Sequence, residues 1–450
     1  MIMKKNDIIT LKIESLTAEG NGVGRFEGMA VFVPLTAVGD TCEVRIVKLA
    51  KTYAFGRLER VVSASKTRTQ ADCEHFAKCG GCVFRHISYD AELMAKQGYV
   101  RDCITRLGGE NLEPLAILGC ENTENYRNKA QLPVASNENG MYFGFFSPRS
   151  HRVVPFKACK IQPDIFTEIA EAVVDYCNQN NIPAYDEASG KGLLRHICIR
   201  KGSKSGEIML VLVVTKNTDA FGSLVAILLE KFENIKTILL NINPKNTNVI
   251  MGERNITLYG EGHIFDTMCG NRVAISPHSF YQVNTPAAEK VYEIAGEFAQ
   301  FNENQTLLDL YCGIGTVGLA FAKRVKKLVG VEVVPQAIEN AKLNAQLNGI
   351  TNAEFYCADA GEMAQKLAEN GEKPNIIIVD PPRKGCDENT LDAIAKMSPE
   401  RVVYISCNPA TLARDVKSLA EKGYKLEKYM PVDMFPRTSH CETIALLCKQ

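Results

Sequence analysis

The sequence predicts a multidomain protein: a small β-barrel, an α+β central domain, and a C-terminal α/β domain built on a doubly wound, seven-stranded sheet. Three observations predict this organisation. Residues 1–62 read as short strands with turn glycines, residues 63–300 mix helices with hairpin-like strands, and residues 301–450 alternate regularly between strand and helix. A chain of 450 residues is long enough for two to four domains.

The composition is that of an ordinary soluble globular protein, with 46% hydrophobic and 23% charged residues. The chain has no apolar run of about 18 residues and no signal-peptide core, so we expect a cytoplasmic protein with no membrane partner. Sixteen cysteines without a secretory signal indicate reduced thiols, metal ligation or catalysis rather than disulfides. A net charge of zero limits any nucleic-acid surface to a local patch.

Residues 1–62 hold about five short strands, which predicts a barrel of the OB type, a common platform for single-stranded RNA. Residues 45–68 form a basic patch that contains only one acid, Glu59. Tyr53 and Phe55 lie between its cations and offer faces on which bases can stack. Its seven cations are Arg45, Lys48, Lys51, Arg57, Arg60, Lys66 and Arg68. A solvated strand face is the alternative interpretation. The glycine-rich turn at 20–25, followed by GMAVFVP, resembles the TRAM domain, an RNA-binding barrel attached to RNA-modifying enzymes.

Three cysteines within ten residues, Cys73, Cys79 and Cys82, predict a metal or cluster site. Both tetrahedral zinc and an iron–sulfur cluster need a fourth ligand. The candidates are His75 and His86 nearby, and Cys103, Cys120 and Cys159 farther along the chain. Spacing alone does not choose between zinc and iron. Farther on, residues 195–204 form a second basic cluster, which fits a phosphate contact or a solvated face better than chemistry.

The C-terminal strands are predicted at 306–312, 327–334, 353–359, 375–382 and 401–407, separated by helical segments. The two final strands are joined by only PRTSHC, which is too short for a crossover helix, so they must pair antiparallel. The sheet therefore has five parallel strands and a terminal hairpin.

Glycines at 313, 315 and 318 match GxGxxG between the first strand and a helix, and Glu332 ends the next strand, placed to accept from ribose hydroxyls. The motif fits an adenosine-containing cofactor and leaves NAD and S-adenosylmethionine (SAM) equally open. The terminal hairpin favours SAM by analogy between folds. Asp359, which ends the third strand, is positioned to reach the adenine.

Cys407 ends a buried strand just before a helix, at the sheet edge where α/β proteins bind ligands. The helix N-terminus would favour the thiolate, which makes Cys407 a candidate nucleophile; a buried structural cysteine is the alternative. Asp380 and its two following prolines form a rigid rim at the end of the fourth strand, or a simple strand-ending turn. Glu442 begins the last strand beneath the same edge and is a candidate general base.

Together these motifs resemble the RNA uracil-5-methyltransferase family over essentially the whole chain. The similarity rests on the TRAM-like barrel, C-x5-C-G-G-C, FYQVN (280–284), LDLYCGIGT (308–316), DPPRKG (380–385), SCNPATLARD (406–415) and FPRTSHCE (435–442). It is greatest for the iron–sulfur, TRAM-bearing branch that acts on 23S rRNA. Arg437 and Cys441 depart from the residues more usual in the last motif, although its Thr-x-His-x-Glu frame is kept.

The resemblance implies a role for each matched position. Cys407 would be the nucleophile and Glu442 the base, and Phe280 would stack near the target base, with Arg383 beside it in the substrate-gripping loop. The residues implied at the SAM site are Gln282, Tyr311, Gly313, Gly315, Glu332, Asp359 and Asp380. A [4Fe–4S] cluster would be held by Cys73, Cys79, Cys82 and Cys159.

The implied function is SAM-dependent methylation of uracil C5 in 23S rRNA, with RNA as the partner and no protein partner indicated. The same chemistry on a tRNA uridine is an alternative, as is a non-catalytic RNA-binding or ribosome-assembly factor. An NAD-dependent oxidoreductase is supported only by the glycine motif. A cytosine-5 methyltransferase is disfavoured because Ser-Cys-Asn-Pro differs from the Pro-Cys loop typical of those enzymes.

Overall fold

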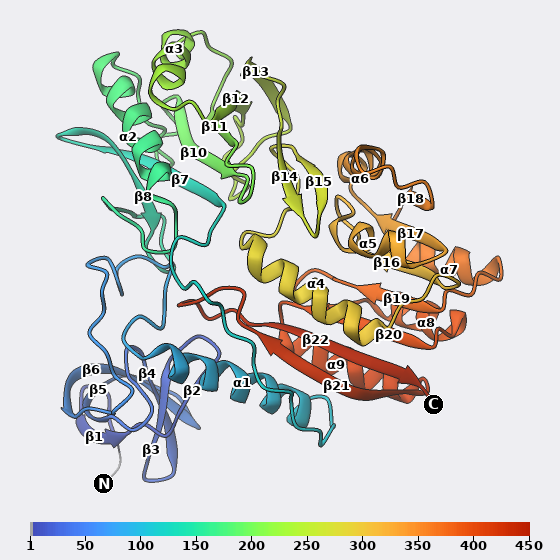
Figure 1. The fold of residues 1–450 in the computed structure, drawn as a ribbon. Helices are drawn as coiled ribbons and strands as arrows, with labels where there is room; N and C mark the ends of the chain where they lie inside the picture. The colour runs from blue at the N-terminus through green and yellow to red at the C-terminus, as the bar shows by residue number, and fades with distance from the viewer. Residues whose placement is uncertain (1–2) are drawn as a thin grey trace.

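The computed structural model describes residues 3–450; the first two residues of the predicted barrel lie outside this range. Figure 1 shows the three parts as separate groups of elements. The barrel lies at the lower left, the central sheet at the top, and the C-terminal sheet with its helices at the right. Among the described residues, no helix is both long and apolar enough to cross a bilayer.

The N-terminal part is a six-stranded sheet in the order β1-β5-β6-β4-β3-β2. Alternating burial along β1 and β5 sends Leu11 and Val44 into a common core. A Cβ on Gly24 would lie 2.3 Å from the carbonyl oxygen of Lys12, so this close approach of β1 and β3 requires glycine. The strands are β1 (Ile8–Lys12), β2 (Ser15–Leu16), β3 (Gly22–Phe26), β4 (Met29–Val33), β5 (Thr41–Leu49) and β6 (Tyr53–Ser63).

The central part is a seven-stranded sheet in the order β13-β12-β11-β10-β7-β8-β9. All neighbours pair antiparallel as predicted except β11 and β12, which are parallel because α3 crosses between them. The elements are β7 (Lys129–Asn137), β8 (Gly140–Phe146), β9 (Val153–Pro155), α2 (Asp164–Gln179), β10 (Leu194–Lys201), β11 (Ile208–Val214), α3 (Gly222–Lys231), β12 (Ile235–Ile242) and β13 (Arg254–Tyr259). A separate hairpin, β14 (Ile264–Met268) and β15 (Asn271–Ile275), leads toward the C-terminal domain.

The C-terminal sheet has the order β18-β17-β16-β19-β20-β22-β21, which confirms the predicted seven strands, five of them parallel. The terminal pair β21–β22 is antiparallel, and β22 inserts beside β20. The strands are β16 (Thr306–Leu310), β17 (Lys327–Glu332), β18 (Ala353–Cys357), β19 (Ile376–Val379), β20 (Arg401–Ser406), β21 (Tyr424–Val432) and β22 (Glu442–Lys449). The helices are α4 (Thr285–Ala299), α5 (Thr316–Phe321), the 3-10 turn η1 (Ala322–Arg324), α6 (Pro335–Leu347), α7 (Ala360–Glu369), α8 (Glu388–Met397) and α9 (Pro409–Glu421).

Helix α1 (Tyr89–Arg106) belongs by sequence to the predicted central range but packs on the C-terminal domain. Its buried Val100 and Ile104 share a hydrophobic core with Leu412 of α9. In Figure 1 it runs beneath β21 and β22, far from the central sheet. The helix therefore connects the segment that follows the barrel directly to the hairpin at the end of the chain.

Candidate active site

Cys407 and Glu442 lie at matching ends of two paired strands. The antiparallel register of β20 and β22 pairs Ser406 with Thr443, so Cys407 directly follows the end of this ladder and Glu442 directly precedes it. Glu442 is only 4% exposed, whereas Cys407 is partly exposed. The two residues thus meet at the carboxyl edge of the parallel strands, where α/β sheets bind ligands.

The loop after β19 is tied to the Cys407 loop by hydrogen bonds. The side-chain amide of Asn408 donates to the carbonyl oxygen of Arg383 over 3.0 Å, and the Thr411 hydroxyl donates to the same oxygen over 3.3 Å. The exposed Arg383 guanidinium lies 3.4 Å from Nε2 of His440 in the hairpin. Three loops from different strands therefore converge on the cysteine.

The electrostatics of this edge oppose ionisation of both predicted chemical groups. Burial, together with the charges of Glu442 and Asp380, raises the pKa of Cys407 to about 11, against the opposing charge of Arg383. Burial also raises the pKa of Glu442 well above its ordinary range, and nearby Asp380 adds to that shift. The net shift in pKa therefore runs against the thiolate that the helix N-terminus is expected to favour. Asn408 caps α9 with its own side chain, and burial of the thiol dominates.

The glycine loop after β16 has the backbone shape of a nucleotide-binding turn. Tyr311, Gly313 and Gly315 all have positive φ, and Gly315 precedes the first turn of α5. A Cβ on Gly313 would meet no atom within 4 Å, so the loop faces open space there. Glu332 uses both carboxylate oxygens on backbone N–H groups, accepting from Gly313 over 3.1 Å and from Val334 over 3.0 Å.

The other predicted cofactor and substrate residues lie on several different elements. Asp380 directly follows β19, the strand that pairs with β16. Asp359 caps α7, accepting from the backbone N–H groups of residues 361 and 362. Gln282 is half-buried and its backbone oxygen accepts from Asn128. Phe280 is 68% exposed, which is unusual for a large aromatic side chain and leaves a face free for stacking.

The four predicted ligand cysteines, Cys73, Cys79, Cys82 and Cys159, line one cavity of about 280 Å³. His75 also lines it, whereas three other candidate ligands lie elsewhere. His86 bonds the carbonyl oxygen of Thr36, Cys103 packs in the core beneath α1, and Cys120 donates to the carbonyl oxygen of Asp433. Among residues 3–450, no group of three or more His, Cys, Asp or Glu side chains is arranged to hold a metal ion. The four thiols are therefore of the kind that binds an iron–sulfur cluster, but they are not arranged as its coordination shell.

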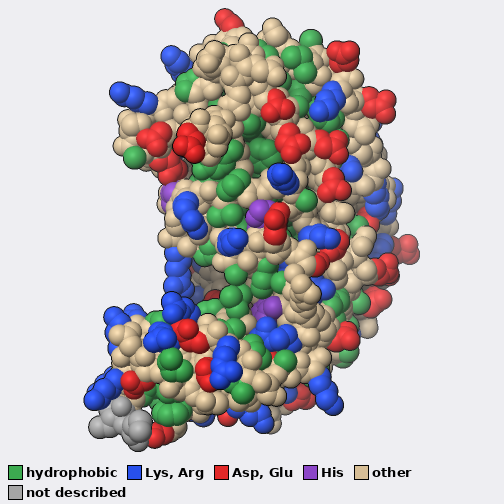
Figure 2. Space-filling model, turned by 90° about the vertical axis from the view of Figure 1, so that its left-hand side faces the viewer, with side chains coloured by type: hydrophobic (Ala, Val, Ile, Leu, Met, Phe, Trp, Pro, Cys, Tyr) green, Lys and Arg blue, Asp and Glu red, His purple; other side chains and the backbone are tan. Residues whose placement is uncertain are grey.

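The barrel presents aromatic rings and cations on its surface. Phe32, Tyr53 and Phe55 form a half-exposed cluster with ring centroids 5.6–5.9 Å apart. Four of the seven predicted cations are paired with acids: Arg45 and Arg57 with Glu59, Arg60 with Glu43, and Arg68 with Asp40. Figure 2 shows a hollow between the barrel and the rest of the molecule, with Lys and Arg side chains along its edge.

The second basic cluster differs from the solvated face that the sequence allowed. Arg195, His196 and Arg200 are buried. Arg195 donates to two backbone carbonyl oxygens, and Arg200 donates to the carbonyl oxygen of Ser279, directly before Phe280. Arg200 therefore supports the loop that presents the exposed aromatic ring.

Residues that sequence reasoning missed lie in α1 and in the loop before Glu442. Glu92, Lys96 and Asp433 are buried together, far apart in the chain. A lysine and a glutamate four residues apart on a helix normally form an exposed pair, so no local pattern marked them. Asn408 was not predicted as a site residue, although its side chain joins two loops of the site.

Comparison with known proteins places these features in a family. Residues 88–450 match the tRNA (uracil-5-)-methyltransferase family, and residues 4–58 match the TRAM domain. Proteins named uncharacterized RNA methyltransferases are similar to the chain: one from Bacillus cereus is 42% identical, covering 99% of this chain and 98% of the relative. One from Clostridium tetani is 40% identical, covering 99% and 97%.

A solved structure supports the same assignment. The Pyrococcus abyssi tRNA (uracil-54, C5)-methyltransferase in complex with S-adenosyl-L-homocysteine is 26% identical, with a TM-score of 0.78, covering 98% of this chain and 100% of that one. The match to the family spans both the central and the C-terminal domains. The chain therefore belongs to the SAM-dependent RNA uracil-5-methyltransferase family, and it carries a TRAM domain at its N-terminal end.

Proposed function

We propose that this protein methylates C5 of a specific uridine in 23S rRNA through a covalent bond between Cys407 and uracil C6. The observation that supports the chemistry is the meeting of Cys407 and Glu442 at matching ends of β20 and β22. Family membership favours methyl transfer over the oxidoreductase and the non-catalytic binding factor. The choice of 23S rRNA rests on the resemblance to the cysteine-bearing, TRAM-bearing branch.

Carbon 5 of uracil is too weak a nucleophile to accept a methyl group unaided, so a covalent step is needed. Addition of the Cys407 thiolate to C6 makes the ring an enolate, and its C5 then becomes nucleophilic. Once C5 has accepted the methyl group of SAM, with S-adenosyl-L-homocysteine as the leaving group, Glu442 removes the C5 proton, and β-elimination breaks the bond to C6 and releases the Cys407 thiolate and 5-methyluridine. The raised pKa of Glu442 suits this role, because a carboxylate with a raised pKa is a stronger base.

SAM, when bound, supplies the electrophilic methyl group. The residues proposed to hold it are the glycine loop, with Gly313 and Gly315, together with Tyr311 and Glu332. Positive φ at both glycines and the open space beside Gly313 support a close approach of a ligand to this backbone. Asp359, Gln282 and Asp380 complete the proposed set, although the Asp359 carboxylate also caps α7.

The target base must leave its stack before Cys407 can reach C6, which costs a few kcal/mol. Stacking on the exposed Phe280 would return roughly 1–3 kcal/mol of that. Arg383 lies close enough to affect the ionisation of Cys407, and we place it at the substrate side of the loop. The aromatic cluster of the barrel would hold neighbouring bases.

We assign Cys73, Cys79, Cys82 and Cys159 as ligands of a [4Fe–4S] cluster, because these thiols line one cavity. Thiolate is the donor that iron–sulfur clusters require. We assign this cluster no chemical role in the methyl transfer. It would instead shape the RNA-binding surface. Iron and sulfide analysis of anaerobically purified protein, with a broad visible absorbance, would support it, and zinc in stoichiometric amount would refute it.

A tRNA uridine is the second candidate substrate, and the similarity to the Pyrococcus abyssi tRNA methyltransferase specifically favours it. The test is transfer of labelled methyl from SAM to unmodified transcripts of 23S rRNA and of tRNA. Product at a uracil C5 of 23S rRNA that is lost in Cys407→Ala supports the proposal. Transfer to tRNA alone keeps the mechanism and overturns the substrate, and transfer that survives in Cys407→Ala overturns the nucleophile.

The proposed base has its own test. Glu442→Gln keeps the size of the side chain and removes its ability to accept the C5 proton, so it should trap RNA that is methylated and still bound to Cys407. A band that survives denaturing electrophoresis and carries the labelled methyl is the expected result. A Glu442→Gln protein that binds both substrates and forms no such adduct refutes the assignment.

A further inference from the structure

The loop between β21 and β22, residues 433–441, carries Glu442 at its end, and its own sequence does not explain its shape. Pro436 removes a backbone donor and prevents a regular hairpin turn. Arg437 has φ of 69°, a left-handed conformation that a side chain with a Cβ rarely adopts. A conformation of this kind persists only where surrounding structure enforces it.

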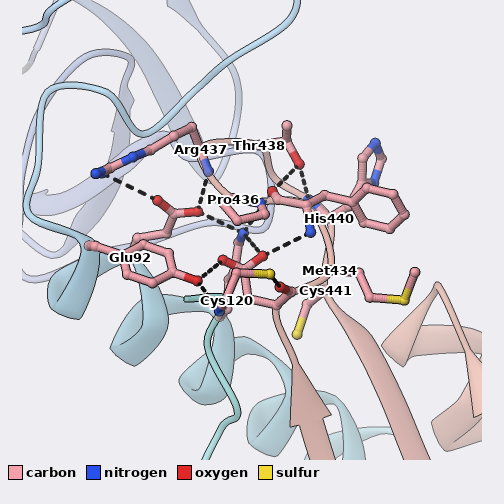
Figure 3. Close-up of polar contacts among 12 residues, drawn as sticks. Glu92, Cys120, Met434, Pro436, Arg437, Thr438, His440 and Cys441 are labelled. Atoms are coloured by element: carbon pink, nitrogen blue, oxygen red, sulfur yellow. Dashed lines mark hydrogen bonds and ion pairs between the residues drawn. The ribbon is translucent and has the colours of Figure 1, made fainter. Parts of the chain in front are cut away.

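Helix α1 supplies much of that enforcement (Figure 3). The Lys96 ammonium donates to Asp433 Oδ1 at the start of the loop over 2.7 Å and to the carbonyl oxygen of Phe435 over 3.3 Å. Glu92 Oε1 accepts from Lys96 over 2.7 Å and from the backbone N–H of Arg437 over 2.7 Å. Two side chains one turn apart on α1 thus bond the loop at three successive points.

Side chains from other segments hold the remaining backbone of the loop. The Tyr126 hydroxyl donates to the carbonyl oxygen of Pro436 over 3.0 Å, and Asn284 donates to that of Met434 over 2.9 Å. Asn284 also caps α4 and ends the FYQVN motif. The carbonyl oxygen of Arg437 accepts from the backbone N–H groups of residues 83 and 84, directly after the three-cysteine motif.

Three of the four charged side chains in this network have almost no access to water, and the fourth, Arg437, is 19% exposed. The side chains of Glu92 and Asp433 are 0% exposed and that of Lys96 is 3% exposed. Tyr89 donates to the second oxygen of Asp433 over 2.9 Å, and the Arg437 guanidinium lies 3.6 Å from Glu92. Two carboxylates are balanced by two cations, and removing one member leaves a buried charge without its partner. The network therefore has one favoured geometry, and the loop follows it.

We propose that Lys96 and Glu92 are positioning residues for removal of the C5 proton: through the 433–441 loop they fix where Glu442 stands. This inference rests on the proposed function, because Glu442 must be the base for its position to matter. Neither residue touches the reacting atoms. The step that depends on them is the one after methyl transfer, so their loss should slow resolution of the adduct more than its formation.

The test uses the full-length protein, labelled SAM, and whichever RNA transcript accepts methyl in the substrate test. Lys96→Met keeps the aliphatic stem and removes the charge. We expect kcat to fall by about tenfold or more, because a general base contributes about 10²- to 10⁴-fold when it is well placed. The dissociation constants for SAM and RNA should change less than threefold, and methylated enzyme–RNA adduct should accumulate.

A matched control separates positioning from loss of stability. Ile104 lies on the same helix, about two turns beyond Lys96, at a fully buried position that shares a core with Leu412 of α9, and its side chain has no polar group that could bond the loop. Ile104→Ala should lower the melting temperature and leave the adduct at the wild-type level. If Lys96→Met does not fold, Glu92→Gln takes its place, because the amide keeps an acceptor for the N–H of Arg437.

Three outcomes decide the inference. Adduct accumulation in Lys96→Met or Glu92→Gln and not in Ile104→Ala supports it. Adduct in Glu442→Gln with none in either α1 variant overturns the positioning role and leaves the proposed function standing. No adduct in Glu442→Gln overturns the proposed base, and the positioning role with it.

Discussion

We expect the thiol of Cys407 to be a poor nucleophile until substrate binds. The positive charge of Arg383 should keep its thiolate fraction from falling still lower. Burial raises its pKa from an ordinary 9.0 to about 11. At pH 8 a thiol of pKa 9 is about 10% ionised and one of pKa 11 about 0.1%, a difference of about 100-fold in thiolate. An exposed cation several ångströms away contributes on the order of 1 kcal/mol after solvent screening. We therefore expect Arg383→Met to lower the thiolate fraction about fivefold further.

The assay is alkylation by iodoacetamide between pH 7 and pH 10, with the rate at Cys407 followed by peptide mass spectrometry. A raised pKa means less thiolate at neutral pH, so the rate should rise about tenfold per pH unit across this range. Exposed Cys357 serves as an internal reference for the reagent, and Arg383→Lys keeps the charge as a matched control. A rate that levels off near pH 8, or that is faster in Arg383→Met, would refute the reasoning.

Three further predictions concern the RNA and cofactor surfaces. Phe280→Ala should lower kcat/KM for RNA about 5- to 150-fold, from the loss of roughly 1–3 kcal/mol of stacking, and leave the calorimetric Kd for SAM unchanged. Gly313→Ala should weaken SAM binding in isothermal titration, because its Cβ would enter the open space where the cofactor is proposed to lie, and should also lower the melting temperature, because alanine is strained at a φ of 55°. Cys82→Ala should lose bound iron and weaken RNA binding in filter assays before SAM binding changes; equal iron content in wild type and variant would contradict it.

Elements defined by local patterns could be predicted from the sequence. The alternation of apolar strands and helices after residue 304, and a six-residue link between the last two strands, were enough to predict the seven-stranded sheet. Turn glycines predicted the barrel, where the structure adds only the two-residue strand β2. The meeting of Cys407 and Glu442 followed from strand order, because both stand at strand ends on one edge.

What could not be predicted depends on burial and on contacts between distant segments. The sequence shows that Cys407 precedes a helix, but not that its thiol is buried beside carboxylates that raise its pKa. Likewise, Glu59 is the only acid within the basic patch, yet Glu43 pairs with Arg60 across two strands, and Asp40 pairs with Arg68 in the segments outside them. In each case the deciding partner comes from another strand or loop.

The hairpin shows why such partners matter for the chemistry. A base that removes a proton from one carbon of a flipped nucleotide must be held to within a fraction of an ångström. Glu442 begins a strand, which fixes its backbone on one side only. The preceding loop contains Pro436 and a left-handed Arg437, so the other side must be fixed by tertiary contacts. Many of those contacts come from α1, which follows the segment that carries three of the cavity cysteines, so the position of the proposed base depends on this helix.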